Sequence, residues 1–219
     1  MKLDRHQRMR DAAFRDDQHA RLRDSHIAPF TDLVDELRAV PGRGWMPYIA
    51  PMYGGTAARV LSVFQDPGPR TRDDDGSGML CCENDDDSAM LHATLLESAK
   101  IPPAELLPWN GYPWYRHTTG KSTGPSASDR DAGVEPLRRL IGLAPSLRVV
   151  MLHGGTAQDV WDRFTKRHRS IARSLHAVPT FHTGRQAFIG THEVRTERLR
   201  HLYESFAEVA EILRQEDAA

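Results

Sequence analysis

Four short apolar runs, each followed within two residues by a reactive polar side chain, constrain the fold of this chain most strongly. The runs are ARVLSVF, ELLPW, LRVVML and HAVPTF, at residues 58–64, 105–109, 147–152 and 176–181. Such runs, bounded by glycine and proline, are typical of buried strands in a parallel sheet. The polar residues that follow them are Asp66, Asn110, His153 and His182. Ligands bind outside the carboxyl ends of the strands in open α/β sheets, so we expect these side chains to converge on one cleft, as in an enzyme.

Amphipathic segments alternate with these runs. Apolar residues recur with helical spacing within residues 27–40, 88–100, 133–143, 155–166 and 193–215. This alternation predicts an α/β fold, a three-layer αβα sandwich with a central, mostly parallel sheet of about four strands. Residues 1–24 are dense in Arg, Asp and His and are expected to form a charged helix or tail, helical in its later part. Residues 25–219 are expected to form a single domain.

Composition narrows the class of protein. The net charge of -1 gives no global field for nucleic acid, although a local basic face stays open. The only two cysteines are the adjacent Cys81 and Cys82, too few for an iron–sulfur cluster or a four-thiolate zinc site. The charged N-terminus MKLDRHQRMR lacks the apolar core of a signal peptide, so we expect none there, and no run approaches the length of a membrane span. We expect a soluble, cytoplasmic, monomeric protein in a reducing compartment.

The turn Gln65-Asp66-Pro67-Gly68-Pro69 directly follows the first apolar run. Its prolines fix φ, and Gly68 permits a tight turn or the close approach of a ligand. The Asp66 carboxylate is thereby expected to be held on a stiff turn above the sheet. The structural alternative is an ordinary turn with a capping Asp; the coincidence with Asn110 and His182 favours a functional one.

The remaining strand-end residues suggest recognition of a polar ligand. The Asn110 carboxamide offers one acceptor and two donors, which complement the carbonyl, N–H, carbonyl edge of uracil, but a turn Asn can also bond its own backbone. A neutral His182 can donate to an oxygen on which negative charge develops, although a buried structural His is the commoner case. His153 precedes a glycine-led helix start that could hold an anion. Asp66 with both histidines could form a two-His-one-carboxylate metal site, but no HxxxH or HExxH spacing supports it.

Four of these motifs, in order, resemble the uracil-DNA glycosylase superfamily, and the segments HIAPFTDLVDELR and SGMLCCENDDDSAM resemble parts of a bacterial glycosylase-like branch. VLSVFQDPGPR resembles the first motif, a strand followed by a water-activating turn, and ELLPWNGYPWY resembles the strand that carries the base-recognising Asn. RVVMLHGGTAQDVW is similar to the strand–Gly–helix segment between the motifs, and VPTFHTGRQAF stands where the family has its His loop. The order and spacing agree from about Val60 to Phe188.

The resemblance implies a metal-free and cofactor-free hydrolase that flips a nucleotide out of DNA and cleaves its N-glycosidic bond, in base-excision repair. Asp66 would stabilise the sugar cation and position the attacking water, and His182 would hydrogen-bond the departing base. Asn110 would select the base. The further base-binding candidates are Gln65, Gly68, Asn84 and His153, and the DNA-binding candidates are Arg70, Lys121 and Arg185.

The chain departs from the family pattern at three places. Gly68 stands where the family's QDPY turn has a Tyr that blocks the thymine methyl group, which implies a broader choice of base. No stacking Phe occurs in residues 77–83, where Met79, Leu80 or Cys81 would take its place. The last loop reads His-Thr-Gly-Arg and lacks the stiffening prolines and the wedge Leu; the gap left by the flipped base would be filled by Arg185, Gln186 or Phe188.

Several of these residues have simpler explanations. Asn84 opens an acidic run that is typical of a solvated helix start, and scattered surface arginines are common. Trp114 and Tyr115 could stack bases, whereas Trp109 fits the core. The resemblance favours a glycosylase; a member that binds nucleic acid or a modified nucleotide without excision, and a hydrolase of free nucleosides, stay open. Salt-dependent DNA binding would separate the first two from the third.

Overall fold

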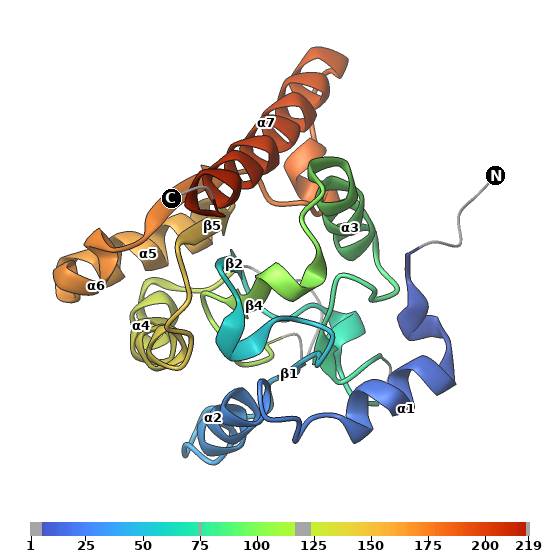
Figure 1. Ribbon diagram of the computed structural model, residues 1–219, viewed down its shortest axis with the longest axis vertical. Helices are drawn as coiled ribbons and strands as arrows, with labels where there is room; N and C mark the ends of the chain where they lie inside the picture. The colour runs from blue at the N-terminus through green and yellow to red at the C-terminus, as the bar shows by residue number, and fades with distance from the viewer. Residues whose placement is uncertain (1–5, 75, 117–123, 218–219) are drawn as a thin grey trace.

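The computed structural model describes residues 6–74, 76–116 and 124–217. Its centre is a parallel sheet of four strands in the order β4-β2-β5-β6 (Figure 1). The strands are β2 (Val60–Phe64), β4 (Leu106–Asn110), β5 (Val149–His153) and β6 (His176–Thr180). Every residue of β4 and β5 is buried, and β2 is buried up to its last residue. The prediction of a parallel sheet of about four strands is confirmed, and the strand boundaries differ from the predicted ones by one or two residues.

Helices cover both faces of this sheet, so the predicted three-layer arrangement is confirmed. On one face, α3 (Asp87–Ala99) packs against α7 (His192–Asp217), which also contacts β6. On the other face, α4 (Ala127–Gly142) packs against α5 (Gly155–Arg167), which lies on β5 (Figure 1). This division follows from right-handed crossovers, because the chain moves in opposite directions across the sheet after β2 and after β4.

Most of the remaining elements lie at the β4 side of the sheet: α1 (Ala12–Ala20), α2 (Ala28–Arg38), and the two-stranded parallel sheet of β1 (Tyr48–Ile49) and β3 (Met79–Leu80). The short helix α6 (Arg169–Arg173) instead contacts α5 and precedes β6. The N-terminal segment is anchored to the domain, since Met9 is buried and the Gln18 side chain accepts a hydrogen bond from the Met52 N–H. Nowhere in the described ranges is there a helix with the length and apolarity needed to cross a membrane.

Two elements differ from the sequence prediction for clear physical reasons. Helix α4 begins at residue 127 instead of 133, because Ser126 and Asp129 form a reciprocal capping box. Its first turns are polar, so the apolar period does not reveal them. The pair β1 and β3 was not predicted, because two-residue strands are too short to show a period.

Candidate active site

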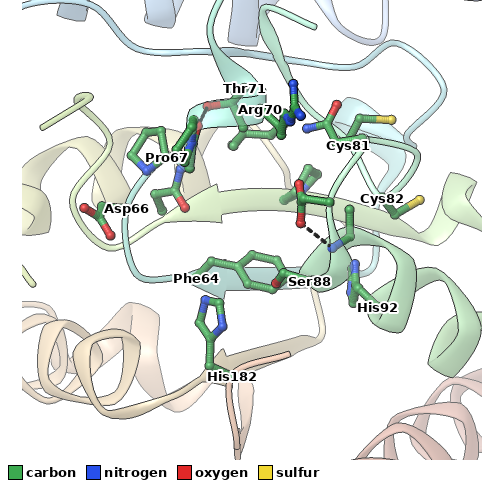
Figure 2. A pocket seen from close by; sticks show the side chains of 18 of the residues that line it. Phe64, Asp66, Pro67, Arg70, Thr71, Cys81, Cys82, Ser88, His92 and His182 are labelled. Carbon is green, nitrogen blue, oxygen red and sulfur yellow. Dashed lines mark hydrogen bonds between the residues drawn. The ribbon is translucent and has the colours of Figure 1, made fainter. Parts of the chain in front are cut away.

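A cavity of about 300 Å³ opens beside the carboxyl ends of β2 and β4. Its wall combines apolar groups with polar side chains from four parts of the chain (Figure 2). These are the segment from Phe64 to Thr71, the segment from Leu80 through the first turns of α3, the end of β4, and the loop after β6. The polar residues among them include Asp66, Asn84, Asp86, Ser88, His92, Asn110 and His182. Cavities of this size are within the range that binds small organic groups.

The Asp66 carboxylate lies in the cavity wall two residues beyond β2. The Gln65 side chain donates from Nε2 to Asp66 Oδ1 at 2.9 Å, and Thr156 Oγ1 donates to Gln65 Oε1 at 3.3 Å. Gln65 therefore orients Asp66, and it is not among the described residues that line the cavity. Its expected contact with a base is not supported by this geometry.

Gly68 lines the cavity as expected, but its backbone does not require glycine. Its φ of -78° and ψ of 166° are extended values that any residue adopts, so the expected glycine-specific turn is absent. The turn is held instead by Thr71, whose N–H and hydroxyl donate to the Gly68 carbonyl at 3.0 Å and 2.7 Å. A Cβ placed on Gly68 would meet nothing within 4 Å, so this part of the cavity is open.

Asn110 is the last residue of β4 and lies in register with Phe64 of β2. It is 2% exposed and lines the cavity. Its Nδ2 is enclosed and has no hydrogen-bond partner in the described part of the chain. Buried polar groups are normally satisfied, and an exception calls for an explanation. A carboxamide with an unused donor at a cavity wall is suited to a ligand that supplies the missing acceptor.

His182 follows β6 and carries a defined tautomer. Its Nδ1 accepts a hydrogen bond from the Gly184 N–H at 2.8 Å, so the proton of the neutral ring lies on Nε2. Burial lowers the pKa of His182, while Asp66 and Asp86 oppose this lowering. The neutral ring can therefore donate from Nε2 at physiological pH. Thr183 anchors the loop through a 2.7 Å hydrogen bond between its hydroxyl and that of Ser88.

His153 does not join the other strand-end residues. It is fully buried and lies flat against Phe64, with ring centroids 4.3 Å apart and planes 5° apart. It is absent from the described cavity wall, so its expected contact with a base is not supported. Burial, with His92 and His182, lowers the pKa of His153 and keeps its ring neutral.

Asn84 lines the cavity but is engaged within its own loop. Its Oδ1 accepts from the Ser77 hydroxyl at 2.7 Å, and its Nδ2 donates to the Met79 carbonyl at 2.9 Å. Asn84 therefore holds the loop in shape. The acidic run after it does begin a helix, since the Asp86 carboxylate caps α3 by accepting from the Ala89 N–H at 2.9 Å.

The predicted DNA-contacting residues lie in different surroundings. Arg70 is exposed and borders the cavity. Arg185 lies outside the wall and forms an ion pair with Asp87. Lys121 falls outside the described residues.

The aromatic residues that were expected to stack on bases or to lie in the core also differ in their surroundings. Trp109 is fully buried, as expected, but Trp114 is also buried and donates its indole N–H to the Leu37 carbonyl at 3.0 Å, so it is not free to stack a base. Tyr115 packs edge-on against Trp45, at 6.2 Å between ring centroids. Of the residues expected to replace the stacking Phe, Leu80 and Cys81 line the cavity and Met79 does not.

Three polar residues and one aromatic residue of the cavity wall were not predicted from the sequence. Phe64 lies between the side chains of His182 and His92 (Figure 2). Asp86, Ser88 and His92 come from the start of α3. The i, i+4 spacing of Ser88 and His92 is the signal that could have placed both on one helix face.

Among the described residues, no group of His, Cys, Asp and Glu could hold a metal ion. The two-His-one-carboxylate alternative therefore has no support from the geometry of Asp66, His153 and His182. Both cysteines are buried free thiols.

No protein-family model matches the chain, and a search of curated proteins finds no match. Among solved structures, the chain is similar to the wild-type SMUG2 of Pedobacter heparinus, with 13% sequence identity and a TM-score of 0.49. The similarity covers 86% of this chain and 85% of that chain.

Proposed function

We propose that the protein is a glycosylase-like hydrolase that cleaves the N-glycosidic bond of uracil or a related base in DNA. The observation that carries the proposal is the meeting of three chemically distinct groups in one cavity. They are the Asp66 carboxylate, the Asn110 carboxamide and the neutral imidazole of His182. Each matches one need of the reaction.

The base is held by the apolar wall and by Asn110. Phe64 offers a flat ring in the cavity wall, against which a planar base can stack. The Asn110 carboxamide can accept from the N–H and donate to a carbonyl of an imide edge. A base inside a duplex cannot reach such a site, so the nucleotide must be flipped out of the stack.

Bond cleavage is supported by His182 and Asp66. The glycosidic bond breaks with its electron pair moving to the base, which leaves positive charge on the sugar. The His182 Nε2–H donates to a base oxygen as negative charge grows there; a donor aimed at developing charge commonly contributes about 100-fold or more in rate. The Asp66 carboxylate stabilises the sugar cation and orients the water that adds to it. The proton released by that water balances the charge on the departing base.

A test is the release of free base from a single-stranded oligonucleotide that contains one uracil, detected by mass spectrometry and by alkaline cleavage of the abasic site. We expect release by the wild type, a loss of about 100-fold or more in Asp66→Asn, and wild-type rates in the control Asp162→Asn. Asp162 is an exposed carboxylate on α5.

Two outcomes would overturn the proposal. One is no release of uracil, hypoxanthine or xanthine by an excess of wild-type enzyme, which would favour binding without excision. The other is full activity in Asp66→Asn, which would mean that the carboxylate has no part in the reaction.

A further inference from the structure

His92 lines the same cavity from a different side. It lies on α3, four residues after Ser88, and both side chains contribute to the wall. The Ser88 hydroxyl already bonds to Thr183, which fixes the loop of His182. His92 has no comparable structural bond among the described residues, although it is only 3% exposed.

The two nitrogens of His92 differ in their surroundings. Within the described part of the chain, Nε2 is enclosed and has no hydrogen-bond partner, whereas Nδ1 is not enclosed in this way. Nδ1 is therefore the nitrogen that can face the cavity. Burial lowers the pKa of His92 to about 3, so the ring is neutral at physiological pH. A neutral imidazole carries one N–H and one lone pair, and it can meet either a donor or an acceptor.

The neighbours of His92 do not call for a polar side chain. Its ring lies edge-on to Phe64, His153 and Phe206, at centroid distances of 5.2, 5.5 and 5.6 Å. A phenylalanine could make the same edge contacts without burying unsatisfied nitrogen. A histidine at this position is explained if a bound ligand makes a hydrogen bond with Nδ1.

Phe64 connects His92 to the rest of the site. One face of the Phe64 ring is covered by His153, and the rings of His92 and His182 lie nearly perpendicular to it, at interplanar angles of 84° and 78°. The ring nevertheless lines the cavity. A planar ligand stacked on Phe64 would therefore lie close to the imidazoles of His92 and His182 and to the Asn110 carboxamide, which all line the cavity.

We propose that His92 is a base-contacting residue that hydrogen-bonds the bound nucleobase from the α3 side and contributes to base selectivity. The proposal rests on the proposed function, since it takes the ligand to be a nucleobase. It adds a polar contact that neither the strand-end residues nor the loop of His182 provide.

The test is equilibrium binding of free uracil and free hypoxanthine, by calorimetric titration, to the wild type, His92→Phe and His153→Phe. His153 is the matched control, because it is an equally buried neighbouring histidine outside the described cavity wall. We expect His92→Phe to weaken binding by about tenfold, the size of one lost hydrogen bond. We expect His153→Phe to bind within about twofold of the wild type.

Equal affinities in all three proteins would overturn the proposal, and so would an equal loss in both variants, which would indicate a packing effect. A second measurement uses the wild type alone: the ¹⁵N resonances of His92 should shift on addition of uracil while those of His153 stay in place. Unmoved His92 resonances at saturation would also overturn the proposal.

The same titration separates this proposal from the excision proposal. A wild type that binds uracil but releases none from DNA would contradict excision and leave the His92 contact to be decided by the variants. A wild type that neither binds a nucleobase nor releases one would overturn both.

Discussion

Asn84 and Asn110 line the same cavity, but the Asn84 carboxamide is bonded at both ends to its own loop, while Asn110 Nδ2 has no partner among the described residues. The two residues have the same chemistry and the same burial of 2% exposed surface. Their hydrogen bonds assign them different roles. Asn84 supports the structure of the wall, and we propose that Asn110 binds the ligand.

This contrast predicts opposite effects of the same substitution. Asn84→Ala should lower the free energy of unfolding by about 1–3 kcal/mol, because the buried Met79 carbonyl and Ser77 hydroxyl lose a partner. Asn110→Ala should change stability by less than about 1 kcal/mol, yet lower kcat/KM for uracil release by about tenfold or more. Urea unfolding and excision rates measure both. A variant Asn110→Ala with normal activity would contradict the role of Asn110.

The open space beside Gly68 predicts that a larger side chain at this position would narrow the cavity without disturbing the fold. Gly68→Tyr should fold normally, since the backbone is extended and a Cβ meets nothing within 4 Å. Its ring should restrict the cavity and reduce release of hypoxanthine relative to uracil by about tenfold. The control is Gly142→Tyr at the end of α4, where a Cβ also has open space. An unchanged ratio of the two rates in Gly68→Tyr would show that this position does not border the bound base.

The buried histidines predict a loss of stability in mild acid. The pKa of His92 falls from its ordinary 6.5 to about 3 in the folded protein, so the unfolded chain binds the extra proton between these values. The contribution of neutral His92 to the free energy of unfolding is therefore fully present above the ordinary pKa and decreases as the pH falls below it. When the pH falls from about 7.5 to about 5, protonation of His92 in the unfolded chain should by itself lower the free energy of unfolding by about 2 kcal/mol.

The same direction holds for His153, whose pKa is also lowered. Urea unfolding at the two pH values should show that His92→Phe loses about 2 kcal/mol less than the wild type. Identical losses in the two proteins would mean that His92 is not held neutral in the folded state.

Arg70 and Arg185 should contribute unequally to DNA binding. Arg70 borders the cavity, whereas Arg185 lies outside the cavity wall. Arg70→Gln should reduce the slope of log affinity against log salt concentration by about 1, as expected for one lost phosphate contact. Arg185→Gln should reduce it less. Fluorescence anisotropy across a salt series measures both slopes, and a larger effect at Arg185 would contradict this order.

The sheet and the ends of its strands were predictable from the sequence because buried parallel strands are continuous apolar runs. Which strand-end side chains face the cavity was not. Asp66 and His182 lie two residues beyond their strands and clear the sheet, whereas His153 is the last residue of the interior strand β5 and lies beneath Phe64. Asn110 is also a last strand residue, but β4 is at the edge of the sheet, beside the cavity.

The contribution of α3 could not be read from apolar periodicity. Asp86, Ser88 and His92 are polar, and the acidic run before them is typical of a solvated helix start. They face the cavity because α3 packs against α7 across one face of the sheet, a tertiary contact that no local pattern encodes. The tautomer of His182 likewise depends on the Gly184 N–H, which only the folded loop brings to the ring.

The central claim is that a neutral His182 acts with Asp66 in breaking a glycosidic bond, and the single-turnover rate of uracil release tests it most directly. The rate should be compared among the wild type, His182→Phe and the control His153→Phe, on a single-stranded oligonucleotide at saturating enzyme. We predict a loss of about 100-fold in His182→Phe, with DNA affinity unchanged, and a near-normal rate in His153→Phe. Equal rates in the wild type and His182→Phe would contradict the account.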